Sequence, residues 1–179
     1  MALRVLTSAA VDAAQLPWEV LAARLRMPEG WRSIPELVLR VDTRLQAALA
    51  MAERRTGRIL VRREVVLVGE GDGTRSIALG VEPVNALIGV DVDLGGGFEE
   101  LPGAALSDGS IELPASLFKG AGLRVTVEAG YGLWDAVPAD LAEVVLLIAE
   151  RGASGDTALD ALIDESIAPF SQRRLGRLT

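Results

Sequence analysis

The pattern of hydrophobic and polar positions predicts a strand, a turn and a helix in the last third of the chain. Between Leu123 and Ala129 apolar residues alternate with polar ones, a period of two that is typical of a strand with one buried face. Glycines on both sides of Tyr131 then predict a turn. Pro138 follows and favours a helix start. From Asp140 the predicted helix is apolar on nearly every side, which indicates that it has neighbours on more than one face.

Two helices are predicted nearer the N-terminus. Residues 16–27 carry apolar side chains spaced for one helical face. Residues 34–56 form the most regular amphipathic pattern in the chain, with Ser33 as the predicted N-cap and Gly57 as the residue that ends the helix. The apolar stripe consists of Leu37, Val41, Leu45, Ala48, Leu49 and Ala52.

The period then changes to that of strands. Residues 59–68 and 75–81 are predicted strands, and the glycine-rich loop between them predicts that they form a hairpin. Residues 110–113 are a further short strand. Residues 86–94 alternate regularly, which predicts that their apolar side chains share one buried face. These side chains are Ala86, Ile88, Val90, Val92 and Leu94.

The C-terminal part is expected to be helical and then extended. A loop is predicted over 151–155, and Asp156 is placed to cap a short helix that Pro169 ends. The expected fold class is α+β: a small helical bundle, made of N-terminal helices and a central C-terminal helix, with an inserted and mostly antiparallel sheet. We expect one domain, with residues 1–57 helical, 58–130 β, 138–165 helical and 166–179 an extended tail.

Composition narrows the possible chemistry. The 179 residues contain 18 basic and 25 acidic side chains, a formal net charge of −7, and neither Cys nor His. The acidic balance argues against a general nucleic-acid binder. The missing residue types exclude disulfides, zinc–thiolate sites, His-ligated metals and Ser-His-Asp catalysis. No stretch of signal-peptide length stands near the N-terminus, so intracellular synthesis of a soluble protein is expected.

Several local motifs could carry chemistry but fit structural roles better. Asp91 and Asp93 start a calcium-loop pattern, yet Pro102 stands where the bidentate Glu is required. The paired acids Glu99–Glu100 and Asp160–Asp164 fit exposed surface better than a glycosidase site. Neither glycine-rich loop, 69–73 or 94–97, has phosphate-loop spacing. A ring that closes the strand-to-helix corner is favoured for Tyr131 over a ligand-stacking role. No cofactor, metal or catalytic residue is predicted.

The order of motifs resembles the head–tail connector, or adaptor, proteins of long-tailed bacteriophages and of phage-derived gene transfer agents. In that family an amphipathic helix ends in a TGR-like turn, and a β region, a GYG turn, a VP-led helix and a terminal "L…PYR" segment follow. The matching positions cover about residues 34–176, and PFSQRR stands where the family has PYR. They are Thr56–Arg58, Ala129–Gly132, Val137–Pro138, Leu162, Pro169–Phe170 and Arg173.

The resemblance implies a structural, non-enzymatic role in the neck of a virion or phage-like particle, assembled in the bacterial cytoplasm. Members form a ring, commonly twelvefold, that docks on the portal protein and receives the stopper or tail on its other side, while DNA passes through the lumen. The expected docking residues are Ile167, Pro169, Phe170, Arg173, Arg174, Leu175 and Arg177. The expected structural turn residues are Gly57, Gly130, Tyr131, Gly132 and Pro138.

Two other functions remain open at this point. Another neck component, such as a stopper or tail-completion subunit, is the first alternative, and an enzyme that uses carboxylates alone is the remote one. For the connector we further expect a lumen that is acidic or neutral, with the basic C-terminal tail facing protein. A lumen lined by Arg40, Arg44 and Arg55 would contradict this expectation.

Overall fold

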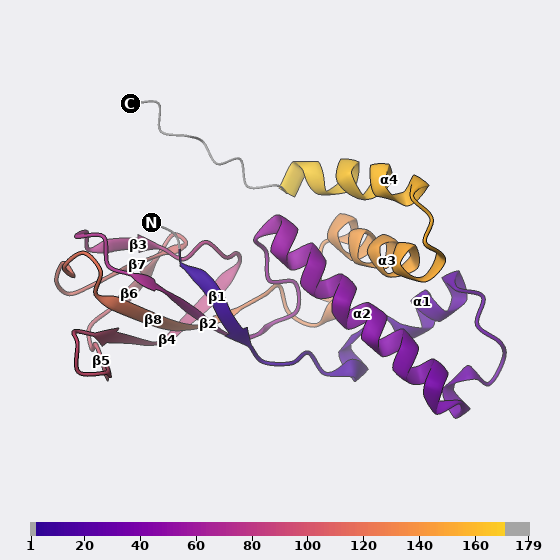
Figure 1. Cartoon of the computed structure of the whole chain (residues 1–179), viewed down its shortest axis with the longest axis horizontal. Helices are drawn as coiled ribbons and strands as arrows, with labels where there is room; N and C mark the ends of the chain where they lie inside the picture. The colour runs from indigo at the N-terminus through magenta and orange to yellow at the C-terminus, as the bar shows by residue number, and fades with distance from the viewer. Residues whose placement is uncertain (1–2, 171–179) are drawn as a thin grey trace. The chain divides into compact units, whose positions relative to one another are not determined.

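The computed structural model describes residues 3–170 of the chain, which form two compact units (Figure 1). One unit comprises the described residues of Met1–Ala10 together with Val61–Tyr131, and the other those of Val11–Leu60 together with Gly132–Thr179. With 40% helix and 28% strand, the predicted α+β class is confirmed. Among the described residues no helix is long and apolar enough to cross a membrane.

The first unit is built on two antiparallel sheets. The larger has the strand order β1-β2-β8-β4-β5, and the smaller has the order β3-β7-β6. In the larger sheet the strands are β1 (Arg4–Ser8), β2 (Arg63–Glu70), β4 (Val84–Asp93), β5 (Phe98–Glu100) and β8 (Gly122–Ala129). In the smaller sheet they are β3 (Ser76–Ala78), β6 (Ala105–Ser107) and β7 (Ser110–Glu112).

Strand β8 is the centre of the larger sheet, as its period of two predicts. Leu123, Val125, Val127 and Ala129 are fully buried, whereas the polar residues between them are half-buried. β8 pairs with β2 on one side and with β4 on the other, and both ladders are antiparallel. The buried apolar face of β8 therefore forms the core of this unit.

Three strand predictions were wrong. Residues 4–8 lie in a strand that pairs with β2, so the first 57 residues are not all helical. The loop at 69–73 does not close a hairpin, because β2 lies between β1 and β8 while β3 pairs with β7. The β4–β8 ladder shifts register between Leu87 and Gly89. A register shift turns the following side chains to the other face, and Ile88 is accordingly 56% exposed while Val90 is buried.

The second unit is helical, and its helix α3 (Ala139–Ser154) contacts all three others. These are α1 (Trp18–Arg24), α2 (Pro35–Thr56) and α4 (Ala158–Ile167). Short 3₁₀ turns stand at Ala13–Gln15, Trp31–Ser33, Trp134–Ala136 and Ala168–Phe170. The predicted central helix and the predicted amphipathic helix at 34–56 are confirmed, since Leu141, Val144 and Val145 of α3 and the inner stripe of α2 are buried.

Three boundaries in the helical unit differ from the prediction. Ile34, not Ser33, is the N-cap of α2, because Ser33 belongs to the preceding 3₁₀ turn. Residues 151–154 continue α3 instead of forming a loop, and Gly155 in the left-handed conformation ends it. The predicted extended tail starts too early, since residues 166–170 are helical.

Candidate interface at the C-terminal helices

The described docking candidates lie where α4 ends. The Ile167 side chain is only 3% exposed and leaves little surface for a partner, whereas Pro169 is exposed and Phe170 is half-buried. The Arg58 guanidinium lies 5.7 Å from the centre of the Phe170 ring, within the range of a cation–π contact. The remaining candidates, Arg173, Arg174, Leu175 and Arg177, lie outside the described residues.

Pro169 and Phe170 line a shallow surface hollow of about 240 Å³. Its other lining residues are Asp140 and Glu143 from the first turns of α3, and Ser166 from α4. An aromatic ring and a proline beside the Asp140 carboxylate make a surface that is apolar with an acidic border, while the Glu143 carboxylate is bound by Arg24. Such a surface suits a protein partner better than a nucleic acid, whose phosphates the carboxylates would repel.

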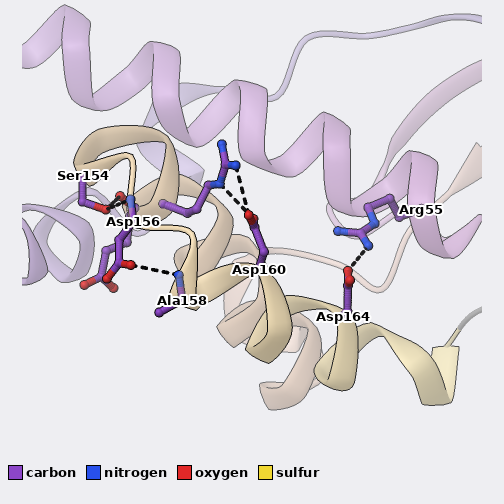
Figure 2. Close-up of polar contacts among 8 residues, drawn as sticks. Arg55, Ser154, Asp156, Ala158, Asp160 and Asp164 are labelled. Atoms are coloured by element: carbon purple, nitrogen blue, oxygen red, sulfur yellow. Dashed lines mark hydrogen bonds and ion pairs between the residues drawn. The ribbon is translucent and has the colours of Figure 1, made fainter.

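Ion pairs hold α4 in place (Figure 2). Arg151 of α3 donates two hydrogen bonds to Asp160, at 2.9 and 3.1 Å, and these bonds raise the pKa of the Arg151 guanidinium. Arg55 of α2 donates to Asp164 farther along α4. Asp160 and Asp164 thus attach one face of α4 to two different helices. The predicted assignment of this acid pair to a structural role, instead of a catalytic one, agrees with these contacts.

The turn between α3 and α4 is closed by local side-chain bonds, also drawn in Figure 2. Ser154 Oγ accepts from the Asp156 N–H at 3.1 Å, and Asp156 Oδ1 accepts from the Ala158 N–H at 2.9 Å. The predicted capping role of Asp156 is therefore confirmed, although Thr157 occupies the N-cap position itself. The bond from Ala158 satisfies an amide group that the first turn of a helix leaves without a partner.

A third arginine contact was not predicted from the sequence. Arg24 of α1 donates to both carboxylate oxygens of Glu143, at 2.9 and 2.6 Å, and lies 3.7 Å from Glu150. The hydrogen bonds to Glu143 are the main cause that raises the pKa of Arg24. Glu143 and Glu150 are seven residues apart on α3 and therefore share a helix face. From the sequence, that spacing indicates only that the two carboxylates lie on one face of α3. It does not identify Arg24 as their partner.

Asp91 and Asp93 are also engaged in local structure. Asp91 accepts from Arg124 Nε at 2.9 Å, and the Arg124 guanidinium lies 4.5 Å from the centre of the Phe98 ring. Asp93 accepts from the N–H groups of Gly95 and Gly97 in the β4–β5 turn, and these bonds lower its pKa. Among the described residues no group of three His, Cys, Asp or Glu side chains could hold a metal ion.

The turn after α2 explains the TGR motif physically. Gly57 has φ 69° and its N–H bonds to the Glu53 carbonyl, a left-handed helix end that glycine adopts without strain. Thr56 Oγ1 donates to the Ala52 carbonyl at 2.8 Å and accepts from the Arg58 N–H at 3.2 Å. The buried carboxylate of Glu53 accepts from the Leu60 N–H at 2.9 Å. This motif thus ends α2 and fixes the path of the chain up to Leu60.

We expect Glu53→Ala to lower the free energy of unfolding by about 1–3 kcal/mol, because it leaves the buried Leu60 N–H without an acceptor. Glu53→Gln retains an acceptor oxygen at the same place and should lose less. Urea denaturation followed by circular dichroism measures both variants. Equal losses for alanine and glutamine would show that the hydrogen bond to Leu60 is not the source of the effect.

The GYG turn lies at the end of β8. Gly130 has φ 121° and Gly132 has φ 149°. The Gly130 N–H donates to the Pro83 carbonyl at 2.9 Å, and its own carbonyl accepts from Asn85 Nδ2 at 2.8 Å. Tyr131 is half-buried, so the expected buried ring was only partly right. Pro138 is the N-cap of α3, with φ −52° and ψ 135°.

Comparison with known proteins gives structural matches over almost the whole chain. No protein-family model and no curated protein matches the sequence. A chain from the neck of an empty gene transfer agent particle, computed with C6 symmetry, superposes with a TM-score of 0.75 at 27% identity. A chain from the virion of a native gene transfer agent particle superposes with a TM-score of 0.73 at 25% identity. A chain from the neck of a native particle, computed with C12 symmetry, superposes with a TM-score of 0.68 at 26% identity.

Each of these matches covers 98% of this chain and 98% of the other. The similarity therefore includes both the sheets and the helical unit, and it does not rest on one common motif. Two of the matched chains come from the necks of gene transfer agent particles and the third comes from a gene transfer agent virion. The resemblance to head–tail connectors inferred from the order of motifs is confirmed, because the chain is similar over almost its whole length to chains of gene transfer agent particles, two of which come from the particle neck.

Proposed function

We propose that this chain is the connector subunit that joins a DNA-filled head to a tail in a gene transfer agent or related phage particle. Copies of the chain form a closed ring, DNA passes through its lumen without sequence-specific binding, and the ring lies between the portal and the stopper or tail. The observation that carries the proposal is the end-to-end match to neck chains, with 98% of both chains covered.

Docking on the portal is proposed to use the end of α4 and the segment that follows it. Pro169 and Phe170 offer an apolar contact at the border of an acidic hollow, and the sequence beyond them carries Arg173, Arg174 and Arg177 but no acidic residue. A basic segment that leaves an acidic body is suited to an acidic or aromatic groove on a different protein. Ile167 contributes to docking indirectly, because its buried side chain packs α4 against the rest of the helical unit.

The test of the function is electron microscopy of particles from a strain that lacks this gene, with DNA content assayed in parallel. We expect heads and tails to accumulate separately, and complementation with the wild-type gene to restore joined particles. Intact tailed particles in the deletion strain would overturn the proposal. Joined heads that lack only a later tail component would favour the stopper or tail-completion alternative.

The docking surface is tested separately by portal pull-down. Removal of residues 171–179, or Phe170→Ala, should weaken portal binding about tenfold or more, because a central aromatic contact carries a large share of an interface's energy. Phe118→Ala is the matched control, since Phe118 is an exposed phenylalanine that belongs to the sheet unit. Unchanged binding by the truncated chain would place portal contact elsewhere.

A further inference from the structure

No other element within residues 3–170 covers the outer face of α2. Its exposed positions recur along the full helix, and Leu39 (66% exposed) and Met51 (40%) are large apolar side chains among them. Around Leu39 the surface forms a shallow hollow of about 310 Å³ whose other lining residues are Glu36, Arg40, Thr43 and Arg44. Three basic side chains, Arg40, Arg44 and Arg54, lie on or beside this face against one acid, Glu36.

The outer face of α4 has the opposite charge. Leu162 is 50% exposed, and Glu165 lies one turn farther along the same face, also exposed. Within Ala158–Ile167 the ionisable residues are Asp160, Asp164 and Glu165, all acidic. Asp160 and Asp164 are bound by Arg151 and Arg55 from the same chain. Glu165 is therefore the acid of α4 that remains for an outside partner.

We infer that the outer face of α4 packs on the outer face of α2 of a second copy of this chain, with Leu162 in the hollow beside Leu39 and Glu165 beside Arg40 and Arg44. The inference rests on the proposed ring and assigns its subunit interface. The occupant follows from complementarity, because an exposed leucine with an acid three residues away meets an exposed leucine flanked by arginines. Residues three apart lie on one helix face, so both contacts form together.

This arrangement is compatible with the proposed ring. The two surfaces belong to different helices, so each copy uses its α2 face toward one neighbour and its α4 face toward the other. Such a heterologous contact forms a ring when the rotation between copies closes. It also places Arg40 and Arg44 against protein, away from the DNA in the lumen. The earlier expectation of an acidic or neutral lumen is consistent with this position.

The test uses the absence of cysteine from the chain, because every thiol introduced into it is then unique. Thr43 on α2 and Ala161 on α4 are both exposed and can be changed with little effect on folding. Particles are prepared with Thr43→Cys, Ala161→Cys or the double variant as the sole copy. They are treated with a bis-maleimide whose span matches the about 8–10 Å between packed helix axes, and products are identified with an antibody to this chain.

We expect the double variant to give a ladder of multiples of this chain, and each single variant to give no such multiples. Joined particles in which the double variant shows no ladder would overturn the assigned interface and leave the proposed function standing. A dimer band from either single variant would also overturn it, since that result requires like faces to meet. Intact tailed particles from the gene-deletion strain would instead remove the proposed function itself.

A charge reversal tests the pairing between Glu165 and the arginines. In the double-cysteine background Glu165→Arg should lower the cross-linked fraction about fivefold or more, because like charges then meet across the interface. Adding Arg40→Glu and Arg44→Glu should restore the ladder, whereas Arg54→Glu, farther along the same helix, should not. Cross-linking that is insensitive to Glu165→Arg, or that is not restored by the double reversal, would overturn the pairing.

Discussion

Gly130→Ala is expected to destabilise the protein by about 3 kcal/mol or more, because the added methyl group combines a steric clash with an unfavourable backbone conformation. An added Cβ would lie 2.6 Å from both Cα and N of Arg62 and 2.7 Å from the Val61 carbonyl carbon. These are backbone atoms of the segment that leads into β2, so they cannot move aside as a flexible side chain would. The residue would also be strained at φ 121°.

The control for Gly130→Ala is Gly155→Ala. Gly155 also has a positive φ, 70°, but nothing lies within 4 Å of its added Cβ. Gly155→Ala should lower the free energy of unfolding by only about 1–2 kcal/mol, the cost of placing a non-glycine residue in the left-handed conformation. Urea denaturation of both purified variants, followed by circular dichroism, separates the steric loss from the conformational one. Equal losses would mean that the close approach of Val61 and Arg62 contributes nothing.

Leu141→Ala is expected to lower the free energy of unfolding by about 2–5 kcal/mol, the range for truncating a buried leucine to leave a cavity. Leu141 has no exposed surface and stands in the first turn of α3, the helix that contacts α1, α2 and α4. A cavity at that position removes apolar contacts that the neighbouring helices cannot recover without leaving their own partners.

The matched control for Leu141→Ala is the same truncation at Leu162, which is 50% exposed on α4. There the loss in unfolding free energy should stay within about 0.5 kcal/mol, the usual range for surface substitutions. The two leucines thus separate a core role from an interface role by denaturant titration alone. A loss at Leu162 as large as that at Leu141 would show that Leu162 contributes to the core of the isolated chain.

Local patterns predicted the elements whose residues carry their own signal. The alternation of Leu123 to Ala129 and the stripe of α2 indicate both the type of element and its buried face, because a strand and a helix repeat with different periods. The end of α2 at Gly57, in the left-handed conformation, was also predicted from the residue type alone. The C-terminal residues expected to dock were found through the order of short motifs, and only Ile167, Pro169 and Phe170 of them lie in the described structure.

Pairing between distant segments was not predictable in this way. The glycine-rich loop after β2 predicted a hairpin that does not form, because a turn signal does not say which strand will be the neighbour. β1 has five residues, too few for a period, and it is a strand because β2 offers it an open edge. Arg24 and Glu143 are 119 positions apart, so neither residue type nor spacing indicated that they meet.

The sequence by itself determined the α+β class, the positions of α2, α3 and β8, and the absence of thiol and imidazole chemistry. Each of these follows from residue type or from a short repeat along the chain. Only the tertiary structure decided the strand order, the face of β4 after its register shift, the arginine pairs that attach α4, and the exposure of Leu39 and Leu162. These depend on which distant surfaces exclude water together, and that is a property of the folded chain and not of any local stretch.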